Sequence, residues 1–159
     1  MHHKLFPLEN SLGFWLYRVH TQGAPALRKE FLSAGLDLMP EQWAVMARLH
    51  ELPGMSQSRL GQKTFKDRHN INRIVNLLEK RGLIERRPDE ADKRANCLFL
   101  TAAGQAILEL STPVVQKHLQ QKLSGISKSD LELVRRILER IVNNMEKINA
   151  DGKGRSETA

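Results

Sequence analysis

The residues with the clearest capacity for chemistry are polar and cationic side chains in residues 68–80, many of them spaced three and four apart. Residues at that spacing share one face of a helix, so these side chains form a single exposed stripe. Asparagine can pair with the edge of adenine through two hydrogen bonds, and arginine can do so with guanine. The stripe therefore indicates a helix that reads bases in the major groove of DNA. Its candidate base-reading residues are Arg68, His69, Asn70, Asn72 and Arg73.

A second basic segment follows in residues 82–101. Two short apolar runs flank a charged tip, which predicts a β-hairpin. Arg94 at the tip is long enough to enter a minor groove, where narrow A·T-rich DNA concentrates negative potential. Asp92 can hold that guanidinium through a forked pair, although an exposed ion pair worth under about 1 kcal/mol is the simpler alternative. With Lys93, these residues are the candidate DNA contacts of the hairpin.

Groups suited to DNA phosphates precede the polar helix. Hydroxyl and amide side chains open a short helix, and two lysines lie at the turn that follows it. Phosphate contacts of this kind position a protein on DNA without reading sequence. The alternative is that the first serine only caps the helix and the lysines are only solvated. The candidate phosphate contacts are Ser56, Gln57, Ser58, Lys63 and Lys66.

The elements that must position these residues are mostly helices. The order helix, short helix, turn, helix, strand, charged loop, strand predicts a winged helix-turn-helix, within a mainly α (α+β) fold. Gly23-Ala24-Pro25 predicts a kink or break in the first helix, and Pro113 predicts a bend in a later one. Apolar residues repeat at spacings of three and four from Leu131 to Ile148, which indicates a seam that needs a partner helix. Residues 150–159 are expected to be disordered.

Composition supports an anionic partner. The 159 residues carry a formal net charge of +7, and residues 56–96 hold 11 Lys and Arg against 6 Asp and Glu. The single cysteine, Cys97, excludes an intramolecular disulfide and fits a reducing cytoplasm. No apolar run is long enough to cross a membrane. We find no catalytic motif and no zinc-ligand spacing, so we expect no enzyme activity and no metal or other cofactor.

The segments also resemble, in order, those of the multiple antibiotic resistance regulator (MarR) family. The resemblance covers about residues 10–147. The matching segments are Gly35-Leu36, Gln42-Trp43-Ala44-Val45, Asn72-Arg73-Ile74-Val75-x-x-Leu78-Glu79, Gly82-Leu83-Ile84, Asp92-x-Arg94 and Leu100-Thr101-x-x-Gly104. The break at Gly23-Ala24-Pro25 departs from the family, whose first helix is usually unbroken.

The resemblance implies a cytoplasmic homodimer, nucleoid-associated when bound, that represses transcription from pseudo-palindromic double-stranded DNA. Residues 1–35 and 105–149 would then form the dimerisation region and residues 36–104 the DNA-binding domain. Two-fold symmetric DNA favours a dimer, although the apolar seam could instead be an intramolecular core. The candidate dimer residues are Leu5, Phe6, Leu8, Leu131, Val134, Leu138, Ile141 and Met145.

The resemblance also implies release from DNA by a small aromatic or phenolic effector. Aromatic and cationic side chains of the first two helices could stack on such a ligand and meet a carboxylate, although both tryptophans could simply be core residues. The candidate effector residues are Trp15, Tyr17, Arg18, His20, Trp43 and Arg48. The alternative function is a constitutive winged-helix module that binds DNA or protein without an effector.

Overall fold

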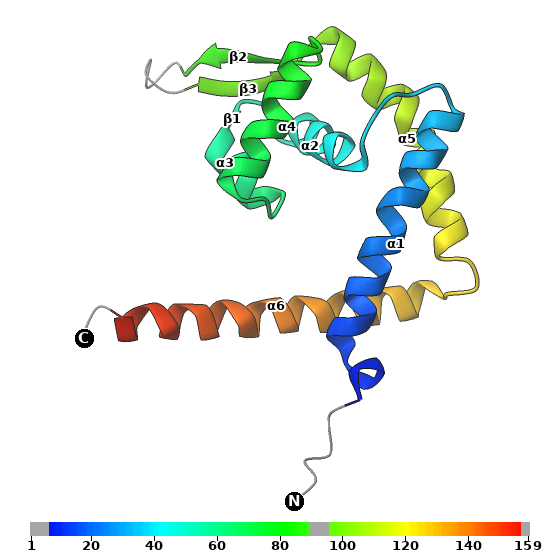
Figure 1. The fold of residues 1–159 in the computed structure, drawn as a ribbon, viewed down its shortest axis with the longest axis vertical. Coiled ribbons are helices and arrows are strands. Elements are labelled where there is room, and N and C mark those ends of the chain that lie inside the picture. Colours follow the sequence, from blue (N-terminus) through cyan, green and yellow to red (C-terminus); the bar gives the residue numbers. More distant parts are fainter. Residues whose placement is uncertain (1–6, 90–95, 157–159) are drawn as a thin grey trace, which may run out of the picture. The chain divides into compact units, whose positions relative to one another are not determined.

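The computed structural model describes residues 7–89 and 96–156 (Figure 1). The chain forms two compact units, with the boundary between Leu119 and Gln120. The described elements are η1 (Leu8–Asn10), α1 (Leu12–Ser33), α2 (Pro40–Glu51), β1 (Met55–Ser56), α3 (Gln57–Lys63), α4 (Arg68–Lys80), β2 (Ile84–Pro88), β3 (Asn96–Leu100), α5 (Ala102–Lys122) and α6 (Lys128–Ser156).

The predicted winged helix-turn-helix is confirmed in the first unit. Helices α3 and α4 form the helix-turn-helix, and β2 and β3 pair antiparallel as the hairpin, with Arg86 opposite Leu98. Strand β1 was not predicted. It is only two residues long and adds to the other edge of β3, so the sheet order is β1-β3-β2. This third strand ties the start of α3 to the hairpin.

One apolar core holds these elements together. Each of α2, α3 and α4 contributes fully buried side chains, and Leu98 of β3 closes the core from the sheet. Phe31 of α1 and two residues of α5, Leu108 and Val115, belong to the same core. The predicted boundary at residues 35 and 36 therefore does not separate two cores, because α1 and α5 pack on the winged helix.

Gly82 and Gly104 fix the junction between α4, the hairpin and α5. Gly82 has a φ of 67°, which suits the left-handed residue after a helix end. The Thr101 hydroxyl donates to the Gly82 carbonyl at 2.6 Å and accepts from the Gly104 amide at 3.0 Å. A Cβ at residue 104 would lie 1.9 Å from the Leu83 carbonyl oxygen, so only glycine fits there.

The expected break in the first helix is wrong. Helix α1 is continuous from Leu12 to Ser33 and contains Pro25. Proline removes one hydrogen-bond donor and crowds the preceding turn. Leu27 and Phe31, on the turns after the proline, pack on the core, and we attribute the continuity of the helix to that packing. Helix α5 contains Pro113 and is also continuous, and the bend expected there stays a prediction.

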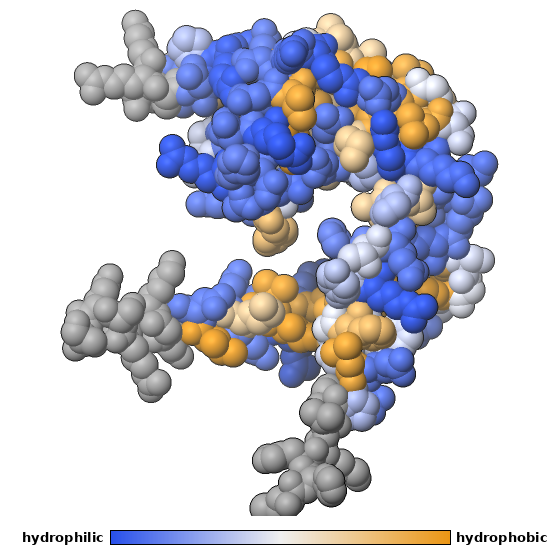
Figure 2. All heavy atoms as spheres, viewed as in Figure 1, coloured by the Kyte–Doolittle hydropathy of each residue, from blue (hydrophilic) through white to orange (hydrophobic). Residues whose placement is uncertain are grey.

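Two further expectations change. Trp15 is half-exposed rather than a core residue of this chain. In the second unit, α6 extends to Ser156, so the helix passes the point where disorder was expected to begin. Its apolar stripe is visible in Figure 2 as a row of hydrophobic side chains.

Candidate nucleic-acid interface

Helix α4 has the two faces that base reading requires. Its inner face is buried through Ile71, Ile74, Val75 and Leu78, which fixes the helix on the core. Its N-terminus is capped by Asp67, whose carboxylate accepts a hydrogen bond from the backbone N–H of Asn70 at 2.8 Å. All five predicted base-reading side chains lie on the exposed part of the helix.

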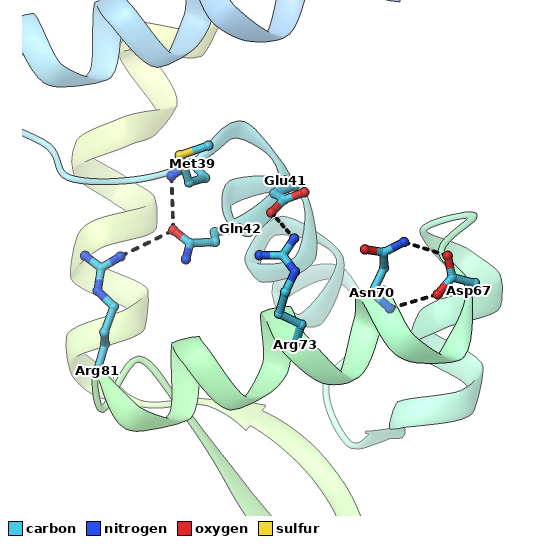
Figure 3. Close-up of polar contacts among 7 residues, drawn as sticks. All are labelled: Met39, Glu41, Gln42, Asp67, Asn70, Arg73 and Arg81. Carbon is cyan, nitrogen blue, oxygen red and sulfur yellow. Dashed lines mark hydrogen bonds and ion pairs between the residues drawn. The ribbon is translucent and has the colours of Figure 1, made fainter.

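Two of those side chains are held by acidic partners (Figure 3). The side-chain amide of Asn70 donates a second hydrogen bond to the Asp67 carboxylate at 2.6 Å. The Arg73 guanidinium donates to the Glu41 carboxylate of α2 at 2.6 Å. The Arg73 and Glu41 side chains are 47% and 32% exposed, so water screens their attraction. This arrangement keeps Arg73 at the surface and lets it exchange the carboxylate for another acceptor at small cost.

Asn72 lies between the predicted base-reading and phosphate-contacting groups. Its side-chain oxygen accepts a 3.3 Å hydrogen bond from Gln57, at the start of α3. Ser56 caps α3 by accepting from the Arg59 amide at 3.3 Å. Ser56 therefore caps the helix, which is the alternative to a phosphate contact at this position. Ser58 and Lys63 are exposed, and Lys66 is half-buried.

Arg86, which we did not single out from the sequence, joins the hairpin to both helices. Its guanidinium is ion-paired with Glu79 of α4 and donates to Asn76 at 2.9 Å and to Gln57 at 3.2 Å. The sequence shows only an arginine in a basic strand, and no local pattern predicts these partners. Through these contacts one side chain connects α3, α4 and β2.

A pocket of about 730 Å³ opens beside this surface, between α3 and the start of α4. It contains three of the predicted DNA-contacting residues on α3 and the turn, and Arg68 from α4. Its lining residues are Gln57, Ser58, Gly61, Gln62, Phe65, Lys66, Arg68 and Ile71.

The predicted contacts at the hairpin tip, Asp92, Lys93 and Arg94, lie outside the described residues, as do Leu5 and Phe6. In the described part of the hairpin, Arg87 lies 4.6 Å from the centre of the Phe99 ring and is paired with Glu85.

Cys97 is poorly suited to redox chemistry. Its thiol donates to the Asp89 carboxylate at 3.2 Å. That hydrogen bond, with burial and the carboxylate charge, raises the pKa of the Cys97 thiol above its ordinary value. A raised pKa disfavours the reactive thiolate.

The six predicted effector residues lie on α1 and α2. Arg18 lies over the Trp15 ring at 5.4 Å, and the Trp15 indole donates to the Glu9 carbonyl at 2.8 Å. Arg48 is paired with Glu51 at 2.6 Å. The Trp43 indole N–H is buried and meets no acceptor among the described residues. Tyr17 and His20 are exposed.

Comparison with known proteins decides the family. The MarR-family profile matches residues 34–95, which contain the helix-turn-helix. An uncharacterised HTH-type transcriptional regulator of Bacillus subtilis (strain 168), YybA, is 30% identical over 112 residues, covering 70% of this chain and 75% of that protein. The chain belongs to the MarR family. Members of the MarR family are DNA-binding transcriptional regulators and not enzymes, as the sequence predicted.

Solved structures place the chain with other regulators. A probable transcriptional regulator from Pseudomonas aeruginosa is 34% identical, covers 85% of this MarR-family chain and 99% of its own, and has a TM-score of 0.73. CouR from Rhodococcus jostii RHA1, solved with p-coumaroyl-CoA, is 25% identical, covers 85% and 94%, and has a TM-score of 0.74. CouR bound to a 23-mer DNA duplex shares the fold at a TM-score of 0.75 and 24% identity, covering 85% and 94%.

None of the helices in the described ranges combines the length and apolar composition of a membrane span. Among the described side chains of this MarR-family chain, no group of three or more His, Cys, Asp or Glu could hold a metal ion.

Proposed function

We propose that this protein is a homodimeric repressor that binds a pseudo-palindromic operator and is released by a small aromatic or phenolic molecule. The observation that carries the proposal is the exposed face of α4, where Asn72 and Arg73 sit on a helix locked to the core and to the hairpin. A regulator with chromosomal DNA as its partner acts in the cytoplasm.

In this proposal the exposed side chains of α4 read base edges in the major groove. Arg73 leaves Glu41 and bonds to a base instead, and Asn72 leaves Gln57 and does the same. The start of α3 meets a phosphate through its first backbone amides and the exposed Ser58 hydroxyl. Arg94 enters the adjacent minor groove, with Asp92 as its brace.

The dimer is supported by apolar side chains that the protomer leaves exposed. Between Lys128 and Asn149 no described side chain is buried. Val134 is 50% exposed and Met145 is 56% exposed, although both belong to the apolar seam. In the other unit, Leu12 and Val19 of α1 and Leu8 of η1 are also exposed. A second copy of the chain would cover such surfaces.

The effector is supported by the Trp43 indole N–H, because a buried donor without an acceptor is uncommon and an acceptor on a ligand would satisfy it. The p-coumaroyl-CoA complex of CouR shows that a related regulator of the same fold accepts a phenolic ligand. A carboxylate on the ligand would pair with Arg18 or Arg48.

The proposal is tested by fluorescence anisotropy with the intergenic DNA beside the gene. We expect binding that excess competitor DNA does not abolish and that simple aromatic acids, such as 4-hydroxybenzoate or p-coumarate, weaken. Binding without preference over competitor would contradict the operator, and insensitivity to a broad panel of such acids would contradict the effector.

Arg94→Ala should weaken binding and lower the slope of log affinity against log salt by about one, because one phosphate-region cation is lost. Lys117→Ala, which removes an exposed positive charge from α5, is the matched control and should leave the slope unchanged. Equal slopes for the two variants would argue against the assigned role of Arg94.

A further inference from the structure

Phe65, in the turn between α3 and α4, combines two unfavourable features. Its φ is 54°, in the left-handed region that side chains disfavour, and its ring is 90% exposed to solvent. In residues 7–89 and 96–156, the other residues with positive φ are all glycines, at positions 35, 54, 82 and 125.

The backbone around Phe65 is one that glycine normally serves. The Phe65 amide donates to the Gln62 carbonyl at 3.2 Å, and the Lys66 amide donates to the Gly61 carbonyl at 2.9 Å. This pair of bonds is the Schellman ending of a helix, whose left-handed position is usually glycine.

Helices α1 and α4 end with the same pair of bonds. Gly35 and Gly82 hold the left-handed position there. The Gly35 amide donates a hydrogen bond to the Leu32 carbonyl at 3.0 Å, and the Gly82 amide donates one to the Glu79 carbonyl at 2.8 Å. The chain therefore uses glycine at two of three equivalent helix ends and phenylalanine at the third.

The protomer gains little burial in return for this conformation, because the ring lies in solvent. Unfavourable backbone conformations persist mainly where function uses them. Phe65 lines the pocket that also contains Gln57 and Arg68, and Gln57 is bonded to Asn72. The ring thus belongs to the surface that carries the proposed DNA contacts.

The surroundings of the ring favour DNA over a protein partner. Lys63, Lys66 and Arg68 lie within three residues of Phe65, and the visible surface over α3 and α4 is mainly hydrophilic (Figure 2). An isolated ring among cations is too small for an apolar docking patch. It does suit a polyanion with an apolar group on its surface, and the thymine methyl in the major groove is such a group.

We propose that Phe65 contacts DNA and that its ring packs on the C5-methyl group of a thymine, beside the bases read by α4. This inference rests on the proposed function. It adds an apolar, sequence-reading contact to a surface whose other contacts are polar or cationic.

The test uses Phe65→Gly, which suits the left-handed backbone and removes the whole side chain, ring included. We expect an unchanged or higher melting temperature together with about tenfold weaker binding to an operator recovered by in vitro selection. The salt slope should not change, because no charge is lost. Wild-type affinity in this variant, with specific binding intact in both proteins, would overturn the inference and leave the proposed function standing.

A second arm replaces the operator thymines one at a time with deoxyuridine, which lacks only the methyl group. Replacement at one position in each half-site should weaken the wild type and leave Phe65→Gly unaffected. If every replacement affects the two proteins equally, the ring does not read a methyl group and the inference fails. Absence of any selected operator for the wild type would instead refute the proposed function.

Discussion

In the protein without DNA, the Arg73 side chain is hydrogen-bonded to the Glu41 carboxylate and the Asn70 side chain to the Asp67 carboxylate. The two carboxylates act differently. Glu41 holds a guanidinium that must leave it to reach a base, whereas Asp67 also caps α4 through the Asn70 backbone. The exposed Arg73 pair can therefore exchange at small cost, while the cap at Asp67 must persist for α4 to keep its first turn. Arg73 can therefore be released without disturbing a helix cap, whereas the partner of the Asn70 side chain is itself the cap of α4.

Asp67 makes a pH-dependent contribution to stability. The hydrogen bond from the Asn70 backbone, followed by that from the Asn70 side chain, lowers the pKa of the Asp67 carboxyl. A carboxyl whose folded pKa is lowered stabilises the fold above its unfolded pKa of about 3.9, and that contribution is lost as pH falls through the folded pKa.

Asp67→Asn should therefore be less stable than the wild type near neutral pH and should lose that deficit in acid, since asparagine is itself a good helix cap. Denaturant titrations from about pH 7 to about pH 2.5 measure the difference, and other carboxyls cancel because both proteins share them. A difference that stays constant across this range would show that Asp67 is not linked to stability in this way.

At the scale of elements, the interface depends on how rigidly α3, α4 and the hairpin are joined. Arg86 makes that connection through Glu79, Asn76 and Gln57. Because its side chain is partly buried and bonded to a charged group, its loss should cost more than the loss of an exposed surface pair.

Arg86→Ala should destabilise the protein by about 1–2 kcal/mol, which corresponds to a melting temperature lower by roughly 3–6 °C. Hydrogen exchange should also quicken at the amides of β2 and β3. Arg87→Ala is the matched control on the same strand, since Arg87 is more exposed and its contacts are with Glu85 of that strand and with Phe99. Equal effects in the two variants would mean that Arg86 does not join the elements.

The elements show what sequence can and cannot predict here. The cap at Asp67 and the left-handed helix end at Gly82 each depend on a few adjacent residues, so local sequence is enough to predict them. The continuity of α1 through Pro25 was not, because packing against a distant core outweighs the local cost of proline. The contacts of Arg86 were missed because they depend on tertiary geometry. The helix end at Phe65 was missed because its left-handed position lacks the glycine that signals such an end at Gly82.

At the scale of the whole molecule, the exposed apolar seam of α6 requires a partner, which we propose is a second copy. Met145→Asp places a charge in that seam and should shift the protein from dimer to monomer at micromolar concentration. Analytical ultracentrifugation over a dilution series measures the shift. Asn143→Asp, the same charge at an exposed position two residues away, should remain dimeric. A monomeric wild type would refute the dimer.

We propose above that the exposed face of α4 reads DNA sequence on a two-fold symmetric site. In vitro selection from a randomised duplex library tests it most directly, because the library contains every candidate half-site. We expect a pseudo-palindrome with half-sites about one helical turn apart, and we expect Asn72→Ala to lose preference at one base pair in each half-site. Selected pools without an enriched motif, or an identical motif for the wild type and Asn72→Ala, would contradict the account.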